Sequence, residues 1–80
     1  MHAMHRNTIP TQEELDKAPL LNNWRLIGTS LYGHVTGHPR LGDRPNVRTS
    51  VVLDLEIEAG WARTLNTLYR LGRPAEVPLN

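Results

Sequence analysis

The sequence predicts an α+β domain with a small antiparallel sheet of two or three strands, a short N-terminal helix and a C-terminal amphipathic helix packed on one face. Three observations predict this fold: a helix-capping signature near the start, alternating apolar and polar residues over positions 47–58, and apolar residues at helical spacing over positions 61–71. We expect a flexible leader at residues 1–9, one domain at residues 10–74 and an extended tail at residues 75–80.

The N-terminal helix is predicted to begin after Thr11. The segment Thr11–Glu14 has the Thr-x-x-Glu form of a capping box, in which the hydroxyl and the carboxylate each accept a hydrogen bond from an end amide of the helix. Pro19 favours an end at Ala18, because the residue before a proline avoids the helical conformation. These signals predict a short helix.

Residues 24–37 predict a bent strand or two short strands, since Gly28 and Gly33 interrupt the apolar alternation. The following stretch, residues 37–46, is rich in glycine, proline and asparagine, which favour turns. We therefore expect it to be a long connection between two antiparallel strands.

Residues 47–58 predict a continuous half-buried strand, because successive side chains of a strand point to opposite faces. The predicted inner face consists of Val47, Thr49, Val51, Leu53, Leu55 and Ile57. Val52 is the one apolar residue that breaks the alternation.

The C-terminal helix is predicted from apolar residues at spacing i, i+4, i+7 and i+8, namely Trp61, Leu65, Leu68 and Tyr69. Gly72 and Pro74 would end this helix. The apolar stripe is expected to pack on the inner face of the strand over residues 47–58, with Trp61 as the central anchor.

Composition excludes several classes of protein. The chain has 80 residues and no cysteine, so one small core without disulfides or thiol chemistry is expected. The longest apolar runs have two or three residues, too short to cross a membrane, and we expect a soluble protein of the cytoplasm. Eight of the nine basic residues are arginine, which suits pairing with carboxylate or phosphate but also follows from a GC-rich genome.

No residue pattern identifies a reaction, a cofactor or a metal site, and we expect no enzymatic activity. His34 and His38 lie near Asp43, Asp54 and Ser50 in the sequence, but no spacing requires a catalytic triad. The two histidines are four residues apart, which suits a metal only on a helix, and the intervening residues disfavour a helix. The histidines at positions 2 and 5 are expected to be solvated.

Two charged segments are candidate partner-binding surfaces. The predicted loop and the residue after it carry Arg40, Arg44 and Arg48 around a single aspartate. The polar face of the predicted strand carries Asp54, Glu56 and Glu58, two residues apart, a repeat of about 6.6–6.8 Å that imitates the phosphates of a nucleic-acid strand. The alternative to a binding role is a purely structural one, in which the loop is solvated and its arginines pair with this acidic face.

A nucleic-acid interface is the alternative function. It would use arginines on phosphates and Trp24 or Tyr32 for stacking on bases. The candidates are the loop arginines Arg40, Arg44 and Arg48, the arginines near or on the predicted C-terminal helix, Arg63, Arg70 and Arg73, and Arg25. The formal net charge of +1 weakens this hypothesis.

Several motifs, in this order, resemble a small and functionally uncharacterised bacterial domain family. They are Gly37–Leu41 (GHPRL), Arg48–Ser50 (RTS), Trp61–Leu65 (WARTL) and Tyr69–Pro74 (YRLGRP). The resemblance extends over about residues 24–75 and implies no catalytic residues.

In size, lack of cysteine and absence of catalytic motifs the chain also resembles anti-CRISPR inhibitors of type I systems, which phages and mobile elements encode. The sequence therefore predicts a non-enzymatic inhibitor that binds a bacterial CRISPR effector complex as a monomer or homodimer and blocks its nucleic-acid target. Binding of nucleic acid by the protein itself is the alternative.

Overall fold

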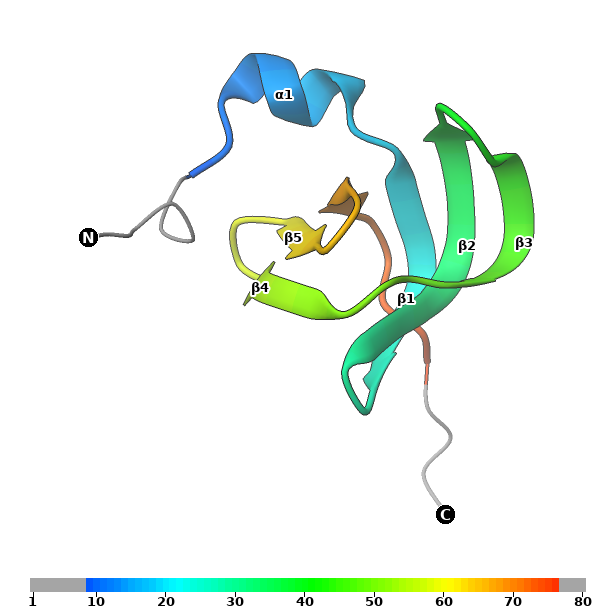
Figure 1. Ribbon diagram of the computed structural model, residues 1–80. Helices are drawn as coiled ribbons and strands as arrows, with labels where there is room; N and C mark the ends of the chain where they lie inside the picture. The colour runs from blue at the N-terminus through cyan, green and yellow to red at the C-terminus, as the bar shows by residue number, and fades with distance from the viewer. Residues whose placement is uncertain (1–8, 77–80) are drawn as a thin grey trace.

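The computed structural model describes residues 9–76 of the 80-residue chain. Most of the predicted leader, with its two histidines, and the last four residues of the predicted tail lie outside the described residues. The described part contains one short helix and six strands (Figure 1).

The N-terminal helix α1 spans Gln12–Lys17 and has the predicted capping box. The Thr11 hydroxyl accepts from the Glu14 amide at 3.1 Å, and the Glu14 carboxylate accepts from the Thr11 amide at 2.9 Å. Ala18 caps the C-terminal end and is buried. Its carbonyl accepts a hydrogen bond from Arg70 Nε, which ties the end of α1 to the sheet.

The sheet is larger than predicted: it has six strands in the order β3-β2-β1-β6-β5-β4. The strands are β1 (Leu20–Ile27), β2 (Ser30–His38), β3 (Gly42–Arg48), β4 (Val52–Glu56), β5 (Trp61–Thr64) and β6 (Leu68–Leu71). All neighbours are antiparallel except β1 and β6, which are parallel. The predicted antiparallel sheet of two or three strands flanked by two helices is therefore wrong.

The first three strands form an antiparallel meander with short turns. Gly28 lies between β1 and β2 with φ +64°, a conformation that glycine adopts at little cost. The long connection predicted over residues 37–46 is wrong, because β2 continues to His38 and β3 begins at Gly42. Pro45 lies within β3, where a missing amide is tolerated because β3 is an edge strand.

The continuous strand predicted over residues 47–58 is divided between the two edges of the sheet. Its start belongs to β3 and its centre to β4. A register shift in the β4–β5 pairing between Val52 and Asp54 marks a bulge, so that Val52 and Leu55 both pack against the core. Leu53, which was predicted to be buried, is 53% exposed.

The predicted C-terminal helix is wrong: its residues form β5 and β6. The chain reverses direction between these strands at a turn in which the Thr64 hydroxyl donates to the Thr67 carbonyl and accepts from the Thr67 amide. Trp61 and Tyr69 are buried, whereas Leu65 in the turn is 64% exposed. The helical spacing of the apolar residues is thus a coincidence of two short strands and one turn.

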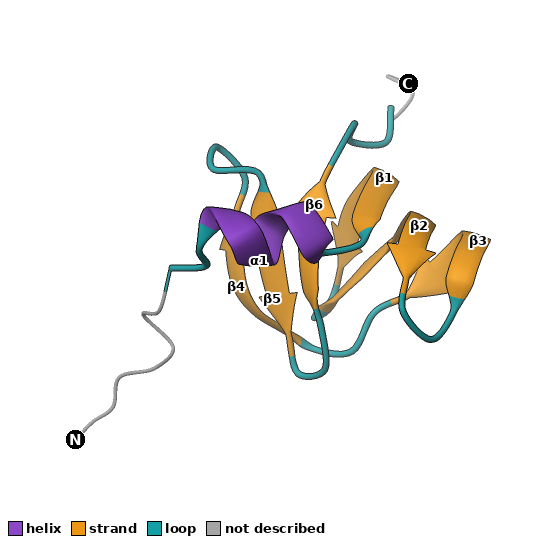
Figure 2. Cartoon of the chain, turned by 90° about the horizontal axis from the view of Figure 1, so that it is seen from above, coloured by secondary structure: helices purple, strands orange, loops and turns teal. Residues whose placement is uncertain are grey.

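The sheet is strongly curled, and the link from β3 to β4 connects its two edges (Figures 1 and 2). This link is anchored on both sides. The Thr49 and Val52 amides donate to the Leu31 and Thr29 carbonyls, and the Leu65 amide donates to the Val51 carbonyl, all at 2.8–2.9 Å. Curling allows a single six-stranded sheet to enclose its own core.

The core lies on the concave side of this sheet. Its buried members are Leu21, Leu31, Val35, Ala62 and Tyr69, which come from β1, β2, β5 and β6. Partly buried apolar side chains pack around them, among them Trp24 and Leu71. Within residues 9–76 no helix has the length and apolar character needed to cross a membrane.

The strand assignment of residues 61–71 predicts different costs for Trp61→Ala and Leu65→Ala. Trp61 is 6% exposed, so its truncation should lower the free energy of unfolding by about 3–5 kcal/mol. Truncation of the exposed Leu65 should change it by about 0.5 kcal/mol or less. Urea denaturation of both variants measures the difference. Similar large losses for both would contradict the strand structure, because a helix packed on the sheet would bury both side chains.

Candidate functional site

The convex face of the first three strands presents a tyrosine between two arginines. Leu31 of β2 points into the core, so the next residue, Tyr32, points to the opposite face. Tyr32 is paired with Arg25 of β1 on one side and with Arg48 of β3 on the other. Directly paired residues of neighbouring strands lie on the same face of a sheet. Tyr32 therefore has an arginine beside it on each neighbouring strand, on the same face of the sheet.

A bulge in β1 sets this arrangement. The β1–β2 register shifts between Asn22 and Arg25, and Asn23 has φ +56°, a left-handed conformation that asparagine tolerates better than most residues. Trp24 then directs its indole Nε1 to the Gly72 carbonyl at 3.0 Å. The bulge thus turns Trp24 toward β6 and places Arg25 opposite Tyr32.

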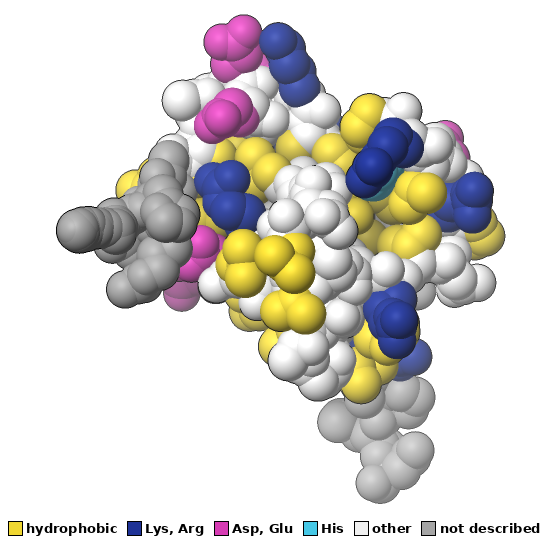
Figure 3. Space-filling model, in the orientation of Figure 1, with side chains coloured by type: hydrophobic (Ala, Val, Ile, Leu, Met, Phe, Trp, Pro, Cys, Tyr) yellow, Lys and Arg dark blue, Asp and Glu magenta, His cyan; other side chains and the backbone are white. Residues whose placement is uncertain are grey.

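These three side chains line a groove, which we call the Tyr32 groove. It has a volume of about 300 Å³, and its other lining residues are Gly33, Asn46 and Val47. An adjoining hollow of about 160 Å³ shares Arg25 and Tyr32 and extends to Glu76. No carboxylate lines the Tyr32 groove itself. Figure 3 shows basic side chains close to the C-terminal end of the described chain.

The predicted arginine cluster is divided between two places. Arg48 belongs to the Tyr32 groove, while Arg40 lies in the turn after β2. Arg44 is exposed on β3 opposite Val35. The Asp43 carboxylate accepts a hydrogen bond from the Gly37 amide at 2.8 Å and so supports the turn.

The predicted acidic row does not lie along one strand. Asp54 is half-buried on β4 and paired with Arg63 of β5. Glu56 is exposed at the end of β4, and Glu58 is exposed in the turn that follows. The regular strand spacing that suggested phosphate mimicry is therefore absent over these three residues.

The other arginines named from the sequence lie on different elements. The Arg63 guanidinium lies 5.8 Å from the centre of the Trp61 ring, within the range of a cation–π contact. Arg70 Nε donates to Ala18, as described above, so this side chain supports the fold. Arg73 is exposed, and its amide donates to Asn22 Oδ1 at 2.7 Å.

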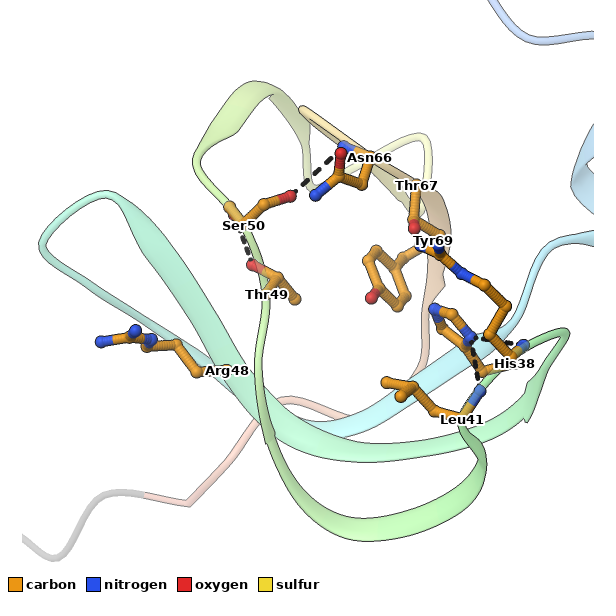
Figure 4. A pocket seen from close by; sticks show the side chains of 9 residues that line it. His38, Leu41, Arg48, Thr49, Ser50, Asn66, Thr67 and Tyr69 are labelled. Carbon is orange, nitrogen blue, oxygen red and sulfur yellow. Dashed lines mark hydrogen bonds between the residues drawn. The ribbon is translucent and has the colours of Figure 1, made fainter.

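A second hollow, which we call the His38 cavity, opens beside the link between the sheet edges (Figure 4). Its volume is about 170 Å³, and it is lined by His38, Arg40, Leu41, Arg48, Thr49, Ser50, Asn66, Thr67 and Tyr69. Figure 4 shows the Arg48 side chain pointing away from His38 and Tyr69, so its guanidinium belongs to the Tyr32 groove.

His38 is buried and held in one orientation. Its Nδ1 accepts from the Arg40 and Leu41 amides, each at 3.1 Å, and its ring centre lies 6.1 Å from that of Tyr69. Burial, together with the nearby positive charge of Arg40, lowers the pKa of His38 below its ordinary value. Burial also raises the pKa of Tyr69. Both side chains are therefore neutral near pH 7.

The pairing of His34 and His38 as metal ligands is not supported by their positions. His34 is exposed, whereas His38 is buried and its Nδ1 is occupied by backbone amides. Among residues 9–76 there is no group of three or more histidine, aspartate or glutamate side chains that could hold a metal ion.

Acidification is predicted to destabilise the protein through His38. The folded chain lowers the pKa of His38, so the unfolded chain binds more protons as the pH falls below the ordinary value of 6.5. Stability from the neutral imidazole is complete above that pH and is lost as the pH falls toward the lowered pKa. Urea midpoints measured from about pH 8 to about pH 5 should fall more steeply for the wild type than for His38→Gln. The same pH dependence of the urea midpoint in both proteins would contradict the assignment of acid destabilisation to His38.

Comparison with known proteins places the chain in a family. A family model described as a family of unknown function, DUF6634, matches residues 2–78. No curated protein and no solved structure matches the chain. The predicted membership of an uncharacterised domain family is confirmed at this level, and the match extends beyond residues 24–75 on both sides. The chain belongs to the DUF6634 family.

Proposed function

We propose that this protein is a small non-enzymatic binding protein whose ligand is single-stranded nucleic acid, bound in the Tyr32 groove. The observation that carries the proposal is the alignment of Arg25, Tyr32 and Arg48 across three neighbouring strands on one exposed face. An aromatic ring on a sheet surface provides a stacking platform for a base, and flanking arginines pair with the phosphates on either side of it.

The geometry suits a single strand. Arg25 and Arg48 are two strand spacings apart, about 10 Å between backbones, and their long side chains can reach a backbone that passes on both sides of Tyr32. The helix α1 has six residues, and its exposed side chains include the acidic Glu13 and Glu14, so it is poorly suited to enter the major groove of a duplex. Stacking on Tyr32 accepts every base, so little sequence preference is expected.

Few phosphates are contacted in this proposal, which accounts for the small net charge of +1. Two arginines lie in the groove, and Asn46 adds a polar side chain. Binding by so few cations is weak and sensitive to salt. Because its affinity is low, the protein would bind only where the local concentration of nucleic acid is high, as an accessory factor of a larger assembly.

Substitutions in the Tyr32 groove test the proposal. Tyr32→Ala should weaken binding of a fluorescent single-stranded oligonucleotide by about 1–3 kcal/mol, since the stacking surface is lost, whereas Tyr32→Phe should retain it. Arg25→Gln and Arg48→Gln should each reduce the slope of log K against log salt by about 0.7. Fluorescence anisotropy over a salt series measures both effects.

The matched control is Lys17→Gln, which removes an equal charge from the exposed end of α1. It should leave both affinity and salt slope unchanged. Equal effects of Lys17→Gln and Arg25→Gln would show that only the total charge matters and would overturn the assignment to the groove.

A second candidate function is inhibition of a CRISPR effector complex by direct protein binding, of the anti-CRISPR type. The observation that favours a protein partner is a group of exposed apolar side chains at the β4 edge. Val51, Leu53 and Leu65 are 41%, 53% and 64% exposed, and the Leu65 amide is bonded to the Val51 carbonyl. Figure 3 shows hydrophobic side chains gathered at the surface in this part of the molecule. With Glu56 and Glu58 nearby in the sequence, they would suit a basic protein surface.

Charge reversal at the β4 edge tests the second candidate. The double change Glu56→Lys and Glu58→Lys should abolish inhibition in a phage-plating assay with an active type I system, because like charges would oppose the basic partner. Asp54 is left unchanged because it is half-buried opposite Arg63. Arg25→Gln serves as the control and should retain inhibition. Absence of inhibition by the wild type, or inhibition that survives charge reversal, would contradict this candidate.

A further inference from the structure

The His38 cavity lies apart from the Tyr32 groove and contains a different set of groups. We propose that it binds a phosphate monoester, either as a free small molecule or as the terminal phosphate of a nucleic-acid strand. The proposal does not depend on binding in the Tyr32 groove, because the guanidinium of Arg48 points away from the cavity.

The chemistry of the lining favours an anion. The nine lining residues include no aspartate or glutamate, and six of them carry hydroxyl, amide, imidazole or phenol groups. Of the two lining arginines only Arg40 contributes its charge, because the Arg48 guanidinium points away from the cavity. Phosphate oxygens accept several hydrogen bonds at once and are repelled by carboxylates. A donor-rich hollow without carboxylates therefore suits phosphate.

His38 offers one oriented donor. Two backbone amides point at its Nδ1, so this nitrogen is the acceptor and the proton of the neutral ring is on Nε2. Figure 4 shows both bonded amides on one side of the imidazole and the other side turned toward Tyr69. The turn after β2 thus fixes the tautomer in which His38 donates.

Tyr69 and Arg40 complete the polar wall. The Tyr69 phenol is protonated at neutral pH, as tyrosine ordinarily is, and burial raises its pKa further, so its hydroxyl can donate. Arg40 lines the cavity together with His38 and Tyr69 and supplies the positive charge of this wall. Arg40 is exposed in its turn and can move toward an anion without disturbing the core.

Ser50 and Asn66 close the opposite side of the cavity. The Asn66 amide donates to Ser50 Oγ at 3.3 Å, which joins the link between the sheet edges to the turn after β5 (Figure 4). Ser50 can donate its own hydroxyl proton to a ligand. The Thr49 hydroxyl has a structural role instead, because it accepts from the Leu31 amide and donates to the Ser50 carbonyl.

The cavity suits a phosphate better than a base. The His38 and Tyr69 rings are tilted by 44° with centres 6.1 Å apart, so they contact one another and leave no parallel slot between them. The volume of about 170 Å³ equals roughly five or six water molecules, enough for a phosphate and a few attached atoms.

Nuclear magnetic resonance of the full chain tests the proposal with inorganic phosphate as the probe, at constant ionic strength. Saturable shifts are expected in the Arg40, Leu41 and Asn66 amides and the His38 ring. Arg40→Gln should weaken phosphate binding by about tenfold, and Asn66→Ala provides a second variant if the first misfolds. Lys17→Gln, which removes a positive charge outside both the His38 cavity and the Tyr32 groove, should leave phosphate binding unchanged. Absence of saturation, or equal shifts with chloride, would overturn the proposal.

Two oligonucleotides of the same sequence, with and without a 5′-phosphate, identify the source of the phosphate. Shifts at His38 with the phosphorylated oligonucleotide alone would support a terminal phosphate, and shifts with inorganic phosphate but neither oligonucleotide would support a free ligand. The unphosphorylated oligonucleotide should shift only Tyr32 and its neighbours. Its failure to do so, with phosphate binding intact, would overturn nucleic-acid binding in the Tyr32 groove and leave the phosphate site supported.

Discussion

The parallel pairing of β1 and β6 is the constraint on which the rest of the structure depends. It joins two antiparallel meanders through the Arg70 amide, which donates to the Pro19 carbonyl, and the Gly72 amide, which donates to the Leu21 carbonyl. A Cβ at Gly72 would collide with the side-chain oxygen of Asn22, which accepts from the Arg73 amide, so a larger residue there would displace the Asn22 side chain. The buried core cluster draws on both meanders, with Leu21, Leu31 and Val35 from one and Ala62 and Tyr69 from the other, so this β1–β6 seam is what brings the two halves of the core together.

The same seam produces both candidate sites. Curling of the joined sheet leaves the convex side of β1–β3 facing solvent, where Tyr32 lies between its two arginines. On the other side it brings Asn66 to Ser50 and so forms the wall of the His38 cavity. Residues far apart in the sequence become neighbours because the two edges of one sheet are connected by a single short link.

Local signals in the sequence were sufficient for some elements and misleading for others. The capping box at Thr11 was predicted correctly, because all its hydrogen bonds lie within four residues. The C-terminal helix was predicted wrongly, because the apolar residues from Trp61 to Tyr69 happen to have helical spacing. In the structure these residues form strands, which are stabilised by the pairing of β6 with β5 on one side and with β1 on the other. The bulge at β4 likewise leaves Val52, the residue that broke the pattern, partly buried against the core.

The sequence by itself determined the short helix, the lack of cysteine chemistry and the arginine-rich composition, because each depends on residues close together or on simple counts. Arg25, Tyr32 and Arg48 could be named as candidates, but not grouped. Their alignment depends on the bulge at Asn23 and on strand register, which are decided by hydrogen bonds between distant segments. The His38 cavity required the tertiary structure for the same reason: Tyr69 reaches His38 only once the sheet has curled.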